Sequence, residues 1–391
     1  MTAAATPPSQ PVLILGGGLM GLAVAHQLAR RGRSVLVLSR RRSEAAGFVA
    51  AGMLAPHAEG LGGALLALGQ ASLGRIPAWV AEIEADSGLG CGLRPCGIVV
   101  PFATAAERDA YPTAAWGTAL DRSALEREIP GIGPLWQAGL LFEQDGQIDN
   151  RRQLMRALER ACVQRGVRFE EGSEVLELIT TGRTSPAAAS APAAGTSTPP
   201  PTPGPRLEAV RLRRADGSTL SLPCRQAVLA CGAWSARLLP QLPVYPVKGQ
   251  MLSLQGPIGA LPRVVFGPGT YLVPREDGLL VVGATSEAEA GFSEGLTPCG
   301  QRRLEQGIAA LLPAASGWPP MERWWGFRPC TPDEGPLLGP GPIGGLWLAT
   351  GHHRNGVLLA ALSAELVAGG ISGEASPGAG EHLEAFRWDR F

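Results

Sequence analysis

The sequence has few charged residues and no excess of either sign. It contains a single lysine, Lys248, and its 34 basic and 34 acidic side chains cancel. A chain without a basic excess has no electrostatic footprint for nucleic acid or for an anionic membrane surface. The seven cysteines include no CxxC pair, and the five histidines lie at no metal-ligand spacing with them. We therefore predict reduced thiols, a cytoplasmic location, no metal site, and no nucleic-acid or membrane partner.

Long apolar runs are also missing. Residues 11–25 are apolar but centre on three glycines and follow no basic segment, unlike a signal peptide. Residues 357–371 are interrupted by Ser363 and Glu365 and are too short to span a bilayer. Hydrophobic residues nevertheless make up 45% of the 391 residues. This length and composition predict a large core divided between two domains.

The first forty residues have the pattern of a βαβ unit. Residues 11–15 are apolar, residues 19–31 carry apolar side chains at helical spacing, and residues 34–38 are rich in valine and leucine. Further helices are predicted at 65–87, 150–166, 301–311 and 356–368, and further strands at 97–102, 167–169, 174–179, 207–213, 227–230, 246–254, 270–274, 279–283 and 346–349. Residues 1–10 read as a disordered tail, and the Pro/Ala/Ser/Thr-rich residues 181–205 as a surface insertion.

A glycine fingerprint joins the first strand to the first helix. Residues 16–21 (GGGLMG) fit G-x-G-x-x-G. In such a motif Gly16 permits the tight turn, Gly18 lets the backbone approach a pyrophosphate, and Gly21 lets helix and strand pack closely. The pyrophosphate would lie at the helix N-terminus, where free N–H groups and the helix dipole favour anions. The sequence therefore predicts a dinucleotide cofactor.

The end of the second strand departs from the usual pattern. The acidic residue that holds the ribose hydroxyls is replaced by Ser39, which accepts a weaker hydrogen bond than a carboxylate. Arg40, Arg41 and Arg42 follow it. Arginines at this place are also compatible with a 2′-phosphate, so NADP stays open as an alternative.

Six segments resemble the D-amino-acid oxidase family of FAD enzymes, and within it the glycine oxidases of thiamine biosynthesis. They are residues 50–59 (AAGMLAPHAE), 246–250 (PVKGQ), 271–275 (YLVPR), 282–285 (VGAT), 325–329 (WGFRP) and 351–356 (GHHRNG). The segments come in the family's order along the chain. The resemblance implies FAD as the cofactor and an α/β fold, in which a Rossmann-like FAD-binding domain is interleaved with a mainly antiparallel α+β substrate domain. The expected FAD-binding domain is discontinuous (11–90, 140–240 and 330–391), and the substrate domain covers 91–139 and 241–329.

The same resemblance assigns site residues. Those expected along the cofactor are Gly16, Gly18, Leu19, Met20, Gly21, Ser39, Arg40, Ala51, Gly52, Met53, Val175, His352, His353, Arg354, Asn355, Gly356, Val357 and Leu358. At the substrate, the resemblance implies that Arg328 and Tyr271 bind an amino-acid carboxylate and that Arg354 lies beside the pocket. A planar guanidinium suits such a carboxylate because it can donate two parallel hydrogen bonds.

The implied activity is oxidative deamination of glycine. Hydride passes from the α-carbon to the flavin, O2 reoxidises the flavin to give H2O2, and the imine is hydrolysed or passed to a thiazole synthase. Ser286 stands where the glycine oxidases carry a methionine, which leaves sarcosine or a small D-amino acid open as substrate. A flavoprotein that modifies a tRNA side chain is the alternative from another class. A homo-oligomer is compatible with the sequence, and Lys248 is either a structural ion-pair partner or an oxygen-activating cation.

Overall fold

The computed structural model describes residues 10–148, 152–181, 204–374 and 377–391. The predicted tail and the predicted low-complexity insertion therefore fall almost entirely outside the described residues. Two large sheets organise the described part of the chain. Across it, no helix combines the length and the apolar composition needed to cross a bilayer.

The first large sheet has six strands in the order β19-β20-β13-β1-β2-β9. Its members are β1 (Val12–Leu15), β2 (Val35–Ser39), β9 (Arg168–Glu171), β13 (Ala227–Leu229), β19 (Leu337–Pro340) and β20 (Leu346–Thr350). All neighbouring strands are parallel except β19, which runs antiparallel to β20. Strands from the beginning, middle and end of the chain thus meet in one sheet, as expected for a doubly wound nucleotide-binding fold.

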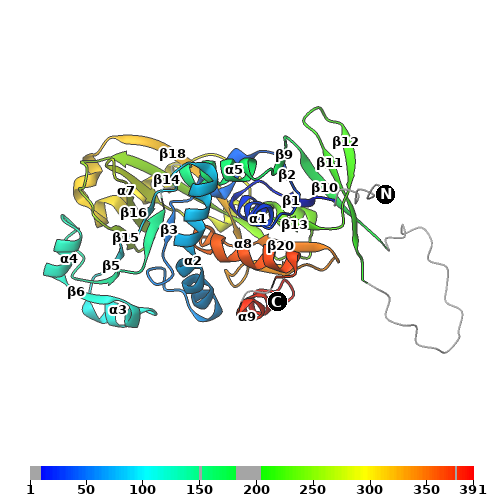
Figure 1. Ribbon diagram of the computed structural model, residues 1–391. Coiled ribbons are helices and arrows are strands. Elements are labelled where there is room, and N and C mark those ends of the chain that lie inside the picture. The colour runs from blue at the N-terminus through cyan, green and yellow to red at the C-terminus, as the bar shows by residue number, and fades with distance from the viewer. Residues whose placement is uncertain (1–9, 149–151, 182–203, 375–376) are drawn as a thin grey trace, which may run out of the picture.

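Helices cover one face of this sheet and a smaller sheet covers the other. Helices α1 (Leu19–Arg30), α5 (Gln153–Gln164) and α8 (Gly356–Ser372), with α2 (Gly63–Ser87) packed on α8 and α5, share one apolar core with Ile14 and Val37. On the opposite face, Leu13 and Leu15 pack with β10 (Glu174–Thr180), β11 (Leu207–Arg213) and β12 (Thr219–Pro223). Strands buried on both faces explain why β1 and β2 are continuous apolar runs. Figure 1 shows β10–β12 at the far end from the second large sheet.

The second large sheet has eight strands in the order β18-β14-β17-β16-β15-β5-β7-β6. They are β5 (Ile98–Phe102), β6 (Thr118–Asp121), β7 (Ala138–Phe142), β14 (Tyr245–Gln255), β15 (Val264–Gly267), β16 (Thr270–Pro274), β17 (Leu279–Gly283) and β18 (Pro320–Cys330). All pairs are antiparallel except β15 with β5. One face packs under α7 (Pro298–Leu311) and α4 (Arg122–Glu128). The other face packs against Ala51, Ala55 and Ala58, which belong to the segment between β2 and α2.

Short elements complete the structure. They are β3 (Met53–Leu54), β4 (Leu93–Arg94) and β8 (Gly146–Ile148), which form a small sheet, α3 (Ala105–Asp109), α6 (Ser235–Leu238), α9 (Ala379–Ala385), and the 3-10 turns Arg42–Glu44, Ala46–Phe48, Ala114–Trp116, Gly232–Trp234, Ala288–Ala290 and Pro313–Gly317. The predicted α/β class and the βαβ unit are confirmed, and most predicted elements differ from the observed ones by a few residues at their ends. Strands β3, β4, β6, β7, β8, β12, β15 and β19 and helices α3, α4, α6 and α9 were not predicted, and no bounds were predicted for β18. The predicted domain boundaries stay a prediction.

Candidate active site

A cavity of about 500 Å³ opens where the carboxyl ends of β1 and β2 face the eight-stranded sheet. Its walls come from the β1–α1 turn, the end of β2, residues 44–53, the start of β10, the residues after β13, strands β14, β16 and β18, and the loop before α8. This position, beyond the carboxyl ends of parallel strands, is where open α/β sheets bind ligands. The volume falls in the range of small-molecule and cofactor sites.

The glycine fingerprint forms one end of the cavity. Gly16 has φ +112°, and a side chain there would collide with the carbonyl oxygen of Ala230. A side chain at Gly21 would collide with the carbonyl oxygen of Gly16, so α1 could not pack so closely on β1. Helix α1 begins after Gly18 and has no side-chain cap. Its free N–H groups therefore face a cradle that fits a pyrophosphate.

The arginines that follow Ser39 are all neutralised by glutamates. Arg40 Nη2 lies 2.8 Å from Glu44 Oε2, and Arg41 pairs with the same Glu44 at 2.9 Å. Arg42 pairs with two further carboxylates, Glu159 at 2.7 Å and Glu171 at 2.8 Å. A 2′-phosphate would have to compete with these carboxylates for the guanidinium groups. The ion pairs therefore make NADP a less favourable ligand. Glu44 lines the cavity and supplies a carboxylate near Ser39, where the usual acidic residue is missing.

The loop before α8 forms the opposite part of the cofactor region. His352 lines the cavity, is 2% exposed, and its Nε2 lies 3.1 Å from Ser363 Oγ. Burial lowers the pKa of His352 to about 3, so the ring is neutral near pH 7. Within the described residues its Nδ1 has no hydrogen-bond partner. A buried ring nitrogen without a protein partner, beside a cavity, fits a polar cofactor such as a flavin.

Most residues predicted along the cofactor line this cavity. They are Gly16, Gly18, Leu19, Met20, Ser39, Arg40, Ala51, Gly52, Met53, Val175, His352, His353, Arg354, Gly356 and Val357. Gly21, Asn355 and Leu358 do not line it. Gly21 serves the packing of α1, Asn355 is buried at the start of α8, and Leu358 packs in the core with its carbonyl accepting a hydrogen bond from Ser72 at 2.6 Å.

Arg328 and Tyr271 line the cavity from the eight-stranded sheet. Arg328 Nη1 donates to the carbonyl of Thr285 at 3.0 Å. A side chain at Gly249, which pairs with Gly326 across β14 and β18, would occupy the space of the Arg328 guanidinium. Burial raises the pKa of Tyr271, although the guanidinium of Arg328 acts to lower it. Among the described residues no carboxylate forms an ion pair with Arg328, so its charge is available to an anionic ligand.

Arg354 differs from Arg328 because a carboxylate already neutralises it. Its Nε lies 2.7 Å from Glu59 Oε2, and its Nη2 lies 3.6 Å from Glu334 Oε2. Burial raises the pKa of Glu59 to about 6, although the cations of Arg354 and Arg328 oppose this shift. No role was predicted for Glu59. The one feature of the sequence that could have predicted a role for Glu59 is its position as an acidic residue at the end of the mostly apolar segment 50–59.

The comparisons with known proteins agree with this geometry. Residues 11–369 match the family described as DAO, FAD dependent oxidoreductase. The chain belongs to the FAD-dependent oxidoreductase family. The family confirms the prediction that the cofactor is FAD, and the residues that line the cavity supply a pyrophosphate cradle, a ribose edge and a polar loop that fit it.

Individual members of the FAD-dependent oxidoreductase family match most of the chain. The "Bifunctional protein ThiO/ThiG" of Synechocystis is 41% identical over 91% of this chain and 50% of its own length. The glycine oxidase of Pseudomonas aeruginosa is 30% identical over 93% of this chain and 95% of its own length. The crystal structure of glycine oxidase from Geobacillus kaustophilus superposes with a TM-score of 0.82, at 28% identity, covering 97% of this chain and 98% of the other. The chain spans about half the length of the bifunctional relatives.

Lys248 lies on the opposite face of the eight-stranded sheet from the cavity. Its neighbours on β14, Gly249 and Met251, line the cavity, whereas Lys248 does not. Its side chain is 1% exposed, and its Nζ lies 5.9 Å from the centre of the Trp325 ring. Because successive residues of a strand point to opposite faces, this placement counts against oxygen activation by Lys248. Its role as an ion-pair partner stays a prediction.

Proposed function

We propose that this FAD-dependent oxidoreductase oxidises the amine of glycine with O2, giving the imine or glyoxylate, ammonia and H2O2. The observation that carries the proposal is the arrangement of Arg328 and Tyr271 in the same cavity as the glycine fingerprint. A guanidinium that no carboxylate of the described residues neutralises and a phenol hydroxyl suit an amino-acid carboxylate. The glycine oxidases among the relatives, which this chain matches over nearly their whole length, support the same substrate.

The side chains of this chain bind and orient the substrate. Arg328 pairs with the carboxylate in a bidentate contact, and the hydroxyl of Tyr271 donates a hydrogen bond to the same group. The carbonyl of Thr285 fixes the direction of the guanidinium, so little freedom is lost when the substrate binds. FAD, when bound, supplies the chemistry by accepting hydride from the α-carbon and passing the electrons to O2.

A thiazole synthase is the recipient that we propose for the product. The support is the group of relatives named ThiO/ThiG, in which a chain like this one is joined to a second part of similar length. In this proposal the protein works in the cytoplasm, as its free cysteines favour. A homo-oligomer stays a prediction.

The test starts with the purified protein. We expect a yellow protein whose flavin is released as FAD on denaturation, and whose visible band is bleached by glycine without oxygen. In air, peroxide should form faster from glycine than from sarcosine or D-alanine. A faster reaction with either of these amines would support the alternative substrates, and bleaching without peroxide would indicate a dehydrogenase. A flavin that no small amino acid reduces would contradict the proposal and favour the tRNA-modifying alternative.

A further inference from the structure

Glu59 is a buried carboxylate within the cavity. It lies on the turn 55–61, which joins β3 to α2, and its side chain is 5% exposed. Within the described part of the chain, Arg354 is its one ion-pair partner. A carboxylate has about four acceptor positions, so a single arginine leaves acceptor capacity for a ligand. Burial of a charged carboxylate is costly, and the one arginine offsets only part of that cost, as the raised pKa of Glu59 indicates.

The other carboxylates of the cavity lie in different places. Glu44 and Glu174 pair with Arg40 at the end of β2, in the nucleotide region. Glu334 has a side chain that is 47% exposed and lies 3.6 Å from both Arg354 and His353, at the mouth. Glu59 is therefore the buried anion on the substrate side of the cavity, and it is close enough to Arg328 for that guanidinium to lower its pKa.

The turn that carries Glu59 is held rigidly from behind. Both oxygens of Asp145, which is fully buried, contact it: Oδ2 accepts from the backbone N–H of Ala58 at 2.7 Å, and Oδ1 lies 2.6 Å from His57 Nδ1. Thr113 Oγ1 donates to the carbonyl of His57 at 2.6 Å, and the hydroxyl of Tyr111 donates to the carbonyl of Ala58 at 2.7 Å. These contacts fix the backbone from which Glu59 reaches the cavity. Such support is typical of a preorganised site.

We propose that Glu59 forms the ammonium end of the substrate site: its carboxylate pairs with the amino group of the bound amino acid and accepts the proton which that group must lose before the α-carbon gives up hydride. The proposal rests on the proposed function. With the substrate carboxylate on Arg328, the ammonium group lies two bonds away and needs an anion nearby. In the proton transfer, one N–H bond of the ammonium breaks, an O–H bond forms on Glu59, and the nitrogen keeps its electron pair.

The surroundings of Glu59 suit this role near neutral pH. The charged and titratable groups around it are Arg354, His353 and Glu334 near the loop before α8, Arg328 on β18, Tyr271 on β16, and Tyr111, His57 and Asp145 on the side of the turn. Burial raises the pKa of Glu59 to about 6 against the two arginines. The carboxylate is thus ionised at pH 7 yet more basic than an exposed glutamate. Below about pH 6 it becomes protonated and can neither pair with an ammonium nor accept its proton.

The experiment compares two ligands on the FAD-loaded enzyme. Glycine has both a carboxylate and an amino group, whereas acetate has only the carboxylate. Acetate affinity is measured from the change in the flavin spectrum, and glycine affinity and reduction rate by anaerobic stopped flow from pH 5 to 9. In Glu59→Gln we expect glycine to bind roughly 10- to 100-fold more weakly, as for loss of a charge-assisted hydrogen bond. Acetate should bind within about threefold of wild type or more tightly, because Arg354 loses its partner.

The pH profile provides the second readout. Reduction by glycine in the wild type should fall as the pH drops through about 6. In Glu59→Gln this limb should move to higher pH, because the glycine amine must then lose its proton to solvent with its own, higher pKa. Glu59→Asp keeps a carboxylate and should return the limb toward its wild-type position and restore part of the glycine affinity, which also shows that the site is intact. Glu128→Gln makes the same change at an arginine-paired glutamate outside the cavity and should behave as wild type.

Two results would overturn the inference. Either an unchanged ratio of glycine to acetate affinity in Glu59→Gln, or an acidic limb that stays near pH 6 in this variant, removes Glu59 from the ammonium site. In both cases wild-type reduction by glycine leaves the proposed function standing. A wild-type flavin that glycine does not reduce overturns the proposed function and this inference together.

Discussion

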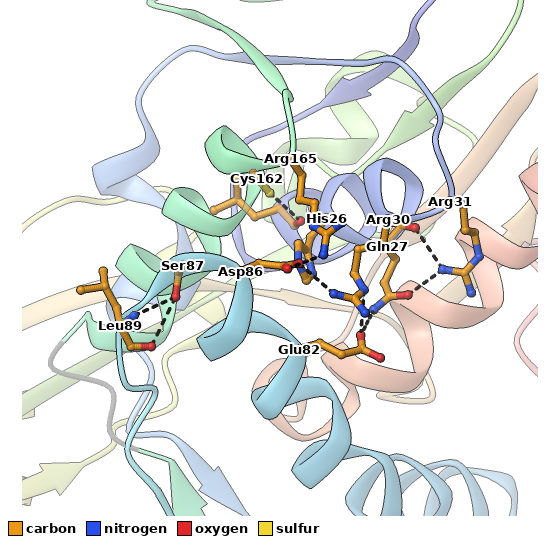
Figure 2. Close-up of polar contacts among 11 residues, drawn as sticks. His26, Gln27, Arg30, Arg31, Glu82, Asp86, Ser87, Leu89, Cys162 and Arg165 are labelled. Atoms are coloured by element: carbon orange, nitrogen blue, oxygen red, sulfur yellow. Dashed lines mark hydrogen bonds and ion pairs between the residues drawn. The ribbon is translucent and has the colours of Figure 1, made fainter.

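Two nearly buried carboxylates of this protein, Asp86 and Glu59, are both paired with arginine, yet their pKa values move in opposite directions. Asp86, at the end of α2, contacts His26 Nε2 at 2.8 Å, Arg30 Nη1 at 2.9 Å and also Arg165. Figure 2 shows these side chains converging on Asp86 from α1 and from the end of α5. Burial alone would raise the pKa of Asp86, but the hydrogen bonds from Arg165, His26 and Arg30 hold it well below its usual range.

Glu59 has fewer partners and a deeper position. One arginine pairs with it, and burial outweighs that pair and raises the pKa of Glu59 to about 6. The number of donors around each carboxylate therefore separates the two cases. The hydrogen bonds of Asp86 join three helices and occupy most of its acceptor positions. Glu59 can change its protonation state near neutral pH, and it has acceptor positions left for a ligand. In this protein, a buried ion pair points to ligand binding or proton transfer only where the carboxylate has far fewer hydrogen-bond donors than it can accept.

The largest expected effect on activity concerns the cavity around Glu59. If Arg328 clamps the substrate carboxylate, Arg328→Ala should keep FAD but lose about 3 kcal/mol of substrate binding and positioning, roughly a hundredfold in kcat/KM. Arg328→Lys should recover part of this loss, because an ammonium keeps the charge but not the two-pronged geometry. Steady-state peroxide assays and stopped-flow reduction by glycine measure both variants.

The matched control for Arg328 is an arginine from the Asp86 cluster. Arg30→Ala should leave kcat/KM per bound flavin near the wild-type value, since Arg30 contacts Asp86 and Glu82 on the outer side of the helices. A well-folded Arg328→Ala with normal glycine affinity and reduction rate would remove Arg328 from the substrate site.

The next effect is on stability and belongs to Asp86. Asp86→Asn leaves His26, Arg30 and Arg165 without their shared anion, and we expect a loss of about 2 kcal/mol, or a Tm lower by roughly 2 to 3 °C. Turnover per bound flavin should not change. Thermal unfolding followed by flavin fluorescence gives the first value, and peroxide assays normalised to flavin give the second. A loss of turnover without a loss of stability would mean that Asp86, like Glu59, contributes to catalysis.

The sign of the pH dependence sharpens this comparison. A carboxyl whose pKa is depressed in the folded state contributes stability above its unfolded pKa of about 3.9 and loses it as the pH falls below that value. The Tm difference between wild type and Asp86→Asn should therefore shrink as the pH falls below about 4. Burial lowers the pKa of His26 despite its bond to Asp86, so His26 opposes folding as the pH falls below about 6.5. A Tm difference that grows as the pH falls through 4 would contradict the role given to Asp86.

The same contrast explains what could be predicted from the sequence. The fingerprint 16–21 and the helix 19–31 are local patterns, with apolar spacing and glycines whose positions determine the turn, and α1 is observed at Leu19–Arg30. Strand β15 (Val264–Gly267) is four residues long and lies close to prolines and glycines. It is stabilised by its neighbours β16 and β5 rather than by its own pattern. Short strands of this kind escape prediction because their stability comes from pairing across the sheet.

The candidate site divides in the same way. Residues carried by motifs, such as Gly18, Ser39 and His352, were assigned in advance and line the cavity. Glu59 and Glu44 were not assigned. Glu59 is distinguished by its pairing with a cation that is distant in the sequence, and Glu44 by its position in the cavity wall. Arg354 lies 295 residues after Glu59, and no local pattern links the two. The pairing of Arg40, Arg41 and Arg42 with glutamates could likewise not be predicted from the sequence, so only the structure could test the NADP alternative.

The smallest expected effect for glycine concerns the cavity wall at Ser286. This residue lines the cavity directly after Thr285, whose carbonyl holds Arg328. Ser286→Met adds bulk without changing any charge, so it tests whether the cavity selects by shape while Glu59 and Arg328 select by charge. Glycine has no side chain to meet the added methionine, and its kcat/KM should stay within about threefold. Sarcosine and D-alanine each carry an extra methyl group and should lose roughly tenfold or more, the range that crowding of one methyl group costs. Ser293→Met changes an exposed residue of the same segment and should leave kcat/KM for all three amines unchanged. A parallel loss for glycine and D-alanine in Ser286→Met would mean that this wall supports Arg328 instead of limiting substrate size.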